Sequence, residues 1–157
     1  MSRTISKFNA FPAPIRKRLI SFIMGHMVPY VGTSGIVIEE MTEERLVATI
    51  ANRKKVQNHI HNVHAAAMAL IAETCTGFVV AMNLPDDKLP LIKTLKVDYL
   101  KRTKGDMKAV ATLTPEQRER IRTEERGNLP VEIHVTDETG EEPIQCEMIW
   151  AWVTKTK

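Results

Sequence analysis

The run at 63–82 constrains the fold of this chain more than any other segment. It is rich in alanine, and its larger apolar side chains, such as Met68, Ile71 and Phe78, are spread around much of a helical circumference. A helix that is apolar nearly all round is buried rather than amphipathic. We therefore predict a thin central helix that begins after Asn62 as its N-cap and is enclosed by a sheet.

One acidic residue, Glu73, lies inside this apolar run. Burying a carboxylate is unfavourable because the group loses its hydration, so an acid at this position needs an explanation. Desolvation should raise the pKa of Glu73, which suits a general base near neutral pH. The alternative is a structural role in which Glu73 pairs with a Lys or Arg side chain or reaches solvent.

A cluster of amide and imidazole side chains directly precedes the predicted helix. It consists of Asn58, His59, His61, Asn62 and His64. The first N–H groups of a helix have no partner within the helix, and they favour an anion or a developing oxyanion. Together with Glu73, this arrangement indicates chemistry at a carbonyl group.

The three histidines also have an H-x-H-x-x-H spacing that could indicate zinc. No acidic or cysteine ligand follows them at a spacing typical of metal sites. We therefore expect no metal ion and no separate cofactor. One histidine is expected at the site, and the other two are expected to be packed or exposed.

The remaining segments predict an α+β domain. A helix is expected from Pro12 to about Tyr30, closed by Pro29 and the turn region Gly32-Thr33-Ser34-Gly35. A second helix is expected over 115–126, begun by a capping box at Thr114 and Gln117 and ended at Gly127. Alternating apolar residues and turn signals predict six strands: 35–40, 45–51, 95–100, 107–113, 130–136 and 144–154.

Composition excludes several classes of protein. The chain has 157 residues, 43% hydrophobic and 26% charged, as expected for one ordinary globular domain. A net charge of +3 with 5% aromatic residues gives little support for nucleic-acid binding. Cys75 and Cys146 lack a CxxC pattern and are expected to be inert buried thiols. We expect no membrane-spanning segment and a cytoplasmic location, although the helix at 12–30 could rest on a membrane surface or a partner.

The pattern resembles the hotdog-fold acyl-CoA thioesterase superfamily. The resemblance covers 35–157: a strand pair, then Asn-His-x-x-x-Val-His-Ala at 58–65, a small-residue helix with Glu73, and the strand at 95–102. It implies an antiparallel sheet of about six strands around a long central helix. It also implies a single domain over 1–157, with an N-terminal helical extension at 1–33, a core at 34–157 and an inserted helix at 115–126.

The resemblance further implies hydrolysis of acyl-CoA thioesters and assigns roles to individual residues. Glu73 would act as base or nucleophile, Asn58 matches an upstream amide, His64 opens the helix, and the Ala65 N–H would bind the oxyanion. Five further residues are expected to contact the substrate, of which coenzyme A is a part: Met68, Thr76, Gly77, Lys101 and Arg102.

Three of these expectations carry a departure or an alternative. Ala65 and Ala66 stand where the family has glycines, and Gly77 stands where it often has Ser or Thr. Lys101 and Arg102 would hold the phosphates of coenzyme A, or they form a solvated strand end.

Helix geometry adds a prediction about assembly. His64 and Glu73 are nine residues apart, which separates them by about 13 Å along a helix and places them on opposite sides. They cannot share a site within one chain, so their cooperation requires a homodimer or homotetramer. Two other functions remain as alternatives to a thioesterase. The chain could be a non-catalytic hotdog domain that binds an acyl ligand, or a membrane-associated scaffold.

Overall fold

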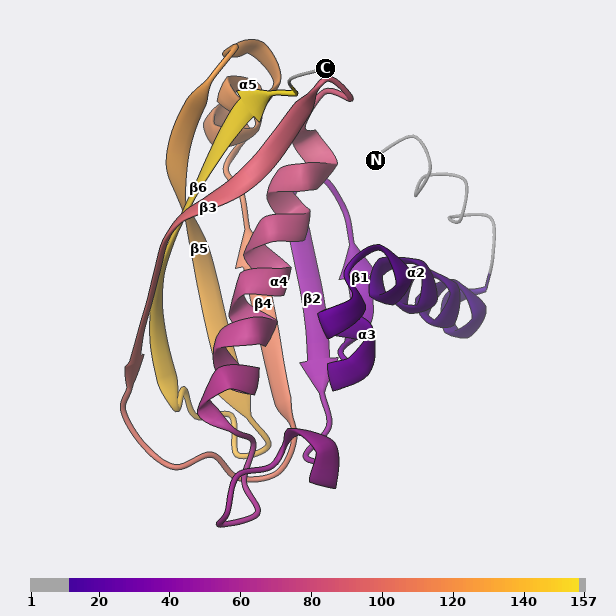
Figure 1. The fold of residues 1–157 in the computed structure, drawn as a ribbon, viewed down its shortest axis with the longest axis vertical. Coiled ribbons are helices and arrows are strands. Elements are labelled where there is room, and N and C mark those ends of the chain that lie inside the picture. The colour runs from indigo at the N-terminus through magenta and orange to yellow at the C-terminus, as the bar shows by residue number, and fades with distance from the viewer. Residues whose placement is uncertain (1–11, 156–157) are drawn as a thin grey trace.

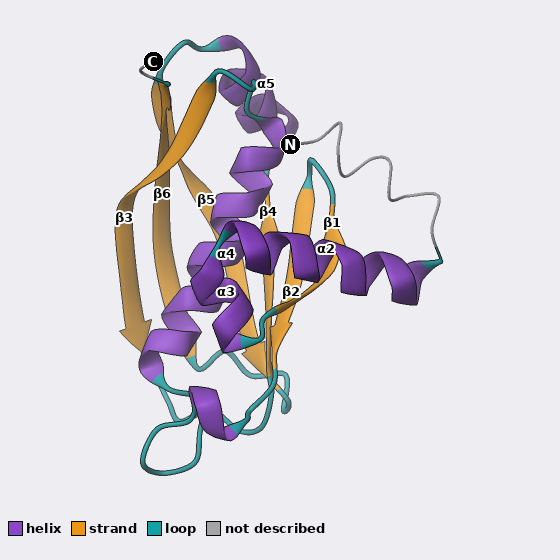
Figure 2. Cartoon of the chain, turned by 45° about the vertical axis from the view of Figure 1, so that its right-hand side comes forward, coloured by secondary structure: helices purple, strands orange, loops and turns teal. Residues whose placement is uncertain are grey.

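The computed structural model of the chain describes residues 12–155, which form one sheet and its helices (Figures 1 and 2). Residues 1–11 of the predicted extension lie outside the described residues. The helices are α2 (Ala13–Met27), α3 (Pro29–Ser34), the 3-10 turn η2 (Lys54–Val56), α4 (Ala65–Asn83) and α5 (Pro115–Thr123). The strands are β1 (Val37–Met41), β2 (Arg45–Ile50), β3 (Lys88–Tyr99), β4 (Met107–Thr112), β5 (Gly127–Asp137) and β6 (Ile144–Thr154).

The six strands form one antiparallel sheet in the order β1-β2-β4-β5-β6-β3. The sheet curves around α4, which packs on its inner face (Figure 1). Ile71, Cys75 and Val79 of α4 are fully buried in the resulting core. The predicted hotdog fold, with a central helix enclosed by a six-stranded sheet, is confirmed.

The central helix is buried by the protein itself. By length and composition α4 could cross a membrane, but 72% of its most apolar window is buried in the fold. Its N-cap is His64, whose Nδ1 accepts a hydrogen bond from the Ala66 N–H at 3.0 Å. The prediction of Asn62 as N-cap was wrong because Val63 pairs with Gln57 in an isolated bridge, which keeps the chain extended up to His64.

The predicted N-terminal helix is divided in two. Helix α2 ends at Met27, Val28 is extended with φ −123° and ψ 92°, and α3 begins at Pro29. The cause is Pro29, which lacks an N–H and disfavours the helical conformation of the preceding residue. A continuous helix to Tyr30 was therefore a wrong prediction, and α3 was missed.

Two strands begin earlier than their patterns indicated. β3 begins at Lys88, seven residues before the predicted start at 95. The prediction missed its first half because that segment, which includes Pro90, Leu91 and Ile92, does not alternate between apolar and polar residues. β5 begins at Gly127, which was predicted to end α5. Gly127 is needed there because a Cβ atom would lie 2.5 Å from the Trp152 ring. The capping box of α5 and the bounds of β6 are confirmed.

The two edges of the sheet differ in length and cover. At the β1 edge, the Ser21 hydroxyl of α2 accepts a hydrogen bond from the Ile38 N–H at 2.8 Å, and Lys17 forms an ion pair with Glu39. No strand of the described residues pairs with the outer edge of β3. Its apolar side chains are exposed: Leu89 by 44%, Leu91 by 50%, Leu95 by 47% and Tyr99 by 50%.

Candidate functional site

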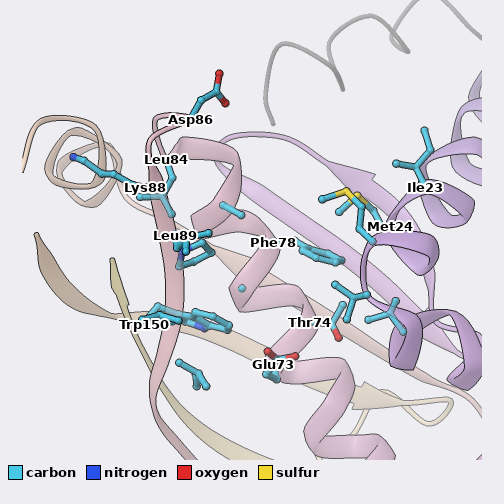
Figure 3. A pocket seen from close by; sticks show the side chains of 18 of the residues that line it. Ile23, Met24, Glu73, Thr74, Phe78, Leu84, Asp86, Lys88, Leu89 and Trp150 are labelled. Carbon is cyan, nitrogen blue, oxygen red and sulfur yellow. The ribbon is translucent and has the colours of Figure 1, made fainter. Parts of the chain in front are cut away.

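A cavity of about 680 Å³ lies between α2 and α3 on one side and α4 and β3 on the other (Figure 3). This volume is typical of small-molecule sites. The lining is mainly apolar and includes Ile23 and Met24 of α2, Phe78 of α4, Leu89 of β3 and Trp150 of β6. Among the described residues, the charged side chains that line it are Glu73, Asp86, Lys88 and Lys155.

The floor of the cavity is one face of α4. Glu73, Gly77, Ala81 and Leu84 line it at helical spacing, so their Cα atoms follow one another along the same side. Glu73 and Leu84 are separated by about 16 Å along the helix axis. Figure 3 shows Glu73 and Thr74 at one end, and Leu84, Asp86 and Lys88 at the other.

Glu73 has no ion-pair partner within the described residues. Desolvation by burial raises its pKa above the usual value for a glutamate, and the neighbouring Thr74 side chain offsets part of this effect. A carboxylate with a raised pKa in an apolar cavity can accept a proton from a bound water near neutral pH, or attack an electrophile directly.

Thr74 is a site residue that the sequence reasoning missed. It is 2% exposed and lines the cavity, and its Oγ1 is buried without a hydrogen bond of normal geometry in the part of the chain described here. Because the Thr74 side chain lowers the pKa of Glu73 through a hydrogen bond, the hydroxyl and the carboxylate together form the polar group at this end of the cavity. Its position directly after the isolated acid of an apolar helix was the available signal.

Gly77 and Thr76 both position Trp150. The Trp150 Nε1–H donates a hydrogen bond to Thr76 Oγ1 at 2.9 Å. A Cβ atom on Gly77 would lie 2.6 Å from the Trp150 ring, so a glycine allows the ring to pack against α4. Gly77 lines the cavity, whereas Thr76 and Met68 are buried in the core and do not line it.

The other predicted catalytic residues lie at the N-terminal end of α4. Asn58 Oδ1 accepts hydrogen bonds from the Ile60 N–H at 3.0 Å and the Asn62 N–H at 3.2 Å, so this side chain holds its own loop. His64 is exposed and caps the helix.

One backbone donor at this end of α4 is free. The N–H groups of Ala66, Ala67 and Met68 are bonded to atoms of His64. Among these first helical residues, the Ala65 N–H has no partner within the described residues. This donor is therefore available to an acceptor from outside the chain.

Tyr99 joins the end of β3 to this region. Its hydroxyl donates a hydrogen bond to the Ala65 carbonyl at 3.0 Å. Lys101 and Arg102 follow directly and are exposed, and Lys101 forms an ion pair with Glu141 at 2.7 Å. The structure therefore brings Asn58, His64, Ala65, Lys101 and Arg102 to one end of α4, with Glu73 farther along the helix.

His59, His61 and His64 do not form a metal-binding group within the described residues. Within residues 12–155, no three His, Cys, Asp or Glu side chains are grouped so that they could hold a metal ion. Both cysteines are free thiols, with Cys75 buried and Cys146 half-buried. Burial raises the pKa of both thiols, that of Cys146 to about 11, which fits the predicted unreactive role.

Residues 16–153 match a family described as a domain of unknown function, DUF4442. The chain belongs to the DUF4442 family. No match was found among curated proteins. The match includes both ends of α4 and every residue that lines the cavity except Lys155.

Solved structures share the fold of this DUF4442 chain at low sequence identity. A probable thioesterase from Pseudomonas aeruginosa has a TM-score of 0.79 at 20% identity, covering 88% of this chain and 95% of its own. A thioesterase from Haemophilus influenzae has a TM-score of 0.67 at 16% identity, covering 94% of both chains. A thioesterase enzyme from Staphylococcus aureus, as an alanine variant of a glutamine, has a TM-score of 0.66 at 15% identity, covering 80% of this chain and 99% of its own. The DUF4442 domain therefore has the hotdog fold found in thioesterases.

Proposed function

We propose that this DUF4442 protein hydrolyses acyl-CoA thioesters as a homodimer or a homotetramer of such dimers, without a metal or separate cofactor. The observation that carries the proposal is Glu73, a carboxylate of raised pKa without an ion pair, at one end of an apolar cavity. The thioesterases among the structural neighbours give the reaction class.

The reaction needs a nucleophile and a site for negative charge. Ionised Glu73 takes a proton from water, which adds to the thioester carbonyl, or it attacks that carbon itself and water then cleaves the anhydride. The C–S bond breaks, the thiolate of coenzyme A takes a proton, and the acid is released. Donors aimed at the developing oxyanion supply much of the rate enhancement in such reactions.

The Ala65 N–H is the oxyanion donor in this proposal, and it must come from a second subunit. Ala65 and Glu73 are about 12 Å apart along one helix, too far for a single thioester carbonyl to reach both. The exposed apolar edge of β3 supports self-association, since long uncovered edge strands are regularly paired or covered. A second copy seated there would bring its own α4 towards the first.

Asn58 is placed in the same shared site, where its amide N–H₂ group remains available after Oδ1 has bonded the loop. Alanine variants of a glutamine and a glutamate fifteen residues apart have been made in the Staphylococcus aureus protein. Asn58 and Glu73 have the same separation, which supports their pairing here. Lys101 and Arg102 would bind the phosphates of coenzyme A from the end of β3.

The test is thiol release from a panel of acyl-CoA esters by the wild type and Glu73→Gln. We expect the rate to fall by about 10²–10⁴-fold when the base is removed. Unchanged hydrolysis would reject Glu73 as the catalytic group. Tight binding of the esters without turnover by the wild type would instead support the non-catalytic alternative.

A mixing experiment tests the shared site. Asn58→Asp keeps the Oδ1 acceptor that holds the loop and removes the amide donor. If sites combine residues from two subunits, unfolding and refolding Glu73→Gln with Asn58→Asp restores about a quarter of wild-type activity, because half of the dimers are mixed and each has one intact site. No recovery on mixing would place all the residues in one chain.

A further inference from the structure

We infer that the cavity between α2, α4 and β3 holds an unbranched aliphatic acyl chain of medium length. The chain lies along α4 from Glu73 towards Leu84, and α2 forms its opposite wall. The inference rests on the proposed function, because the thioester is placed at Glu73. It adds a substrate class and assigns specificity to α2, whose residues have no part in the proposed catalysis.

The length of the floor sets the length of the chain. Glu73 and Leu84 are separated by about 16 Å along α4. A C–C bond of about 1.5 Å advances an extended chain by roughly 1.3 Å, so about ten to twelve carbons fit. The cavity volume of about 680 Å³ accommodates such a chain.

The distribution of polar groups fixes which end of the ligand lies where. Charged lining residues stand at the two ends, and the side chains between them are apolar. At the far end, Lys88 Nζ donates to the Glu124 carbonyl and Lys155 Nζ donates to the Asp86 carbonyl, so both ammonium groups already have acceptors.

At the near end, the Glu73 carboxylate and the buried Thr74 hydroxyl both line the cavity. These two polar groups favour the thioester at the Glu73 end and the hydrocarbon towards Leu84. A ligand with a second charged group in its middle would find no partner there.

The walls suit a flexible hydrocarbon. Gly77 and Ala81 have small side chains, which leave room for a ligand along α4. Ile23, Met24 and Phe78 form the sides of this space. Met side chains adapt their shape to apolar ligands. Each methylene moved from water into such a lining is expected to tighten binding about fourfold, until the chain reaches the far end.

Helix α2 has two distinct faces. Ile20, Ile23, Met24 and Met27 line the cavity, whereas Phe22 does not and is 73% exposed. The hydrogen bond between the Ser21 hydroxyl and the Ile38 N–H fixes the helix against β1. These neighbouring positions on one helix therefore provide a matched pair of substitutions.

The experiment measures kcat/KM for butanoyl-, octanoyl-, dodecanoyl- and hexadecanoyl-CoA with the wild type and three variants. We expect the wild-type kcat/KM to rise to about dodecanoyl and fall at hexadecanoyl. Ala81→Leu fills the floor, and Ile23→Trp fills the opposite wall. Each should lower the ratio of dodecanoyl to butanoyl kcat/KM at least tenfold, while Phe22→Trp leaves that ratio within twofold.

A binding measurement separates this inference from catalysis. Trp150 packs against Gly77, about 6 Å along α4 from Glu73, so 6-bromododecanoate should quench its fluorescence, and the shorter 6-bromohexanoate, which binds more weakly, should not at the same concentration. Ala81→Leu should weaken the quenching at least tenfold. Trp150→Phe gives the background from Trp152, which does not line the cavity.

Each outcome decides one of the two claims. Hydrolysis of short or aromatic thioesters alone, without quenching by 6-bromododecanoate, overturns the aliphatic chain and leaves the proposed function standing. Quenching that Ala81→Leu weakens, without hydrolysis of any ester, rejects the thioesterase and supports the chain site. A dodecanoyl preference that Ala81→Leu and Ile23→Trp leave unchanged overturns the placement of the chain.

Discussion

The two edges of the sheet are treated in opposite ways. The β1 edge is five residues long, and α2 covers it with a hydrogen bond from Ile38 to Ser21 and an ion pair between Lys17 and Glu39. The β3 edge is twelve residues long and exposes Leu89, Leu91, Leu95 and Tyr99. An edge that exposes both backbone groups and apolar side chains is a template for pairing with another chain.

In the proposed dimer, this difference gives one edge to the fold and the other to assembly. The cavity lies between them, with α2 from the β1 side on one wall and β3 on the other. A second subunit at β3 would therefore reach the site, while the covered β1 edge would take no part. The following substitutions test the contrast, starting with the largest expected effect.

Leu95→Arg places a charge on the exposed face of β3, outside the residues that line the cavity. We expect monomers in sedimentation velocity, and a loss of activity of about 10²–10³-fold because the oxyanion donor of the partner is removed. Val37→Arg, on β1, should leave the oligomeric state unchanged. A monomeric Leu95→Arg protein with full activity would break the contrast.

Ser21→Ala removes the hydroxyl that accepts the Ile38 N–H at the β1 edge. A partly buried donor without a partner should lower the free energy of unfolding by about 1–3 kcal/mol, seen as a lower midpoint in urea. Ser21→Thr keeps the hydroxyl and serves as the control. Both variants should remain dimeric, and new higher oligomers of Ser21→Ala would show that this hydroxyl also blocks pairing.

Glu73→Gln should stabilise the protein in a pH-dependent manner. Because burial raises the Glu73 pKa in the folded state, ionisation opposes folding, and the destabilisation develops as pH rises from the unfolded pKa to the folded one. Glu73→Gln should therefore melt at a higher temperature than the wild type at pH 7.5 and at the same temperature at pH 4.

The size of that gain also reports on the partner. Each kcal/mol corresponds to about 2–4 °C in Tm for a chain of this length. The gain should be smaller in the Leu95→Arg background, where no second subunit adds to the desolvation. A gain that is equal at both pH values would contradict burial of the carboxylate.

Lys17→Ala should have the smallest effect. Its ion pair with Glu39 is partly exposed, so its loss should lower the free energy of unfolding by about 0.2–1 kcal/mol. The effect should shrink in 0.5 M salt as screening weakens the pair. Lys17→Gln keeps the aliphatic part of the side chain and separates the loss of charge from the loss of packing.

The fold could be predicted where one periodic pattern decided it. The small-residue run at 65–83 predicted a buried helix, and the alternation in β6 gave the bounds of that strand. Two features were missed. The chain resumes a helix, α3, after the break at Pro29, and Gly127 begins β5 because the absence of a Cβ makes room for Trp152, a tertiary contact that no local pattern indicates.

The site was predictable only in part. Glu73 is conspicuous as an acid in an apolar helix, but the cavity beside it depends on α2, which is more than forty residues away in sequence. No local pattern links Met24 to Glu73. Thr76 was predicted to contact the substrate, but its hydroxyl accepts a hydrogen bond from the Trp150 ring N–H. Thr74 is the threonine that lines the cavity.

Helix α2 has a consequence for how this protein can vary. The same fifteen residues shield the β1 edge with Ser21 and Lys17 and line the cavity with Ile20, Ile23 and Met24. A shift of the helix along its axis would alter both tasks at once. Changes in chain-length preference should therefore arise from side-chain size at these three positions, because moving or removing the helix would also expose a second edge to aggregation.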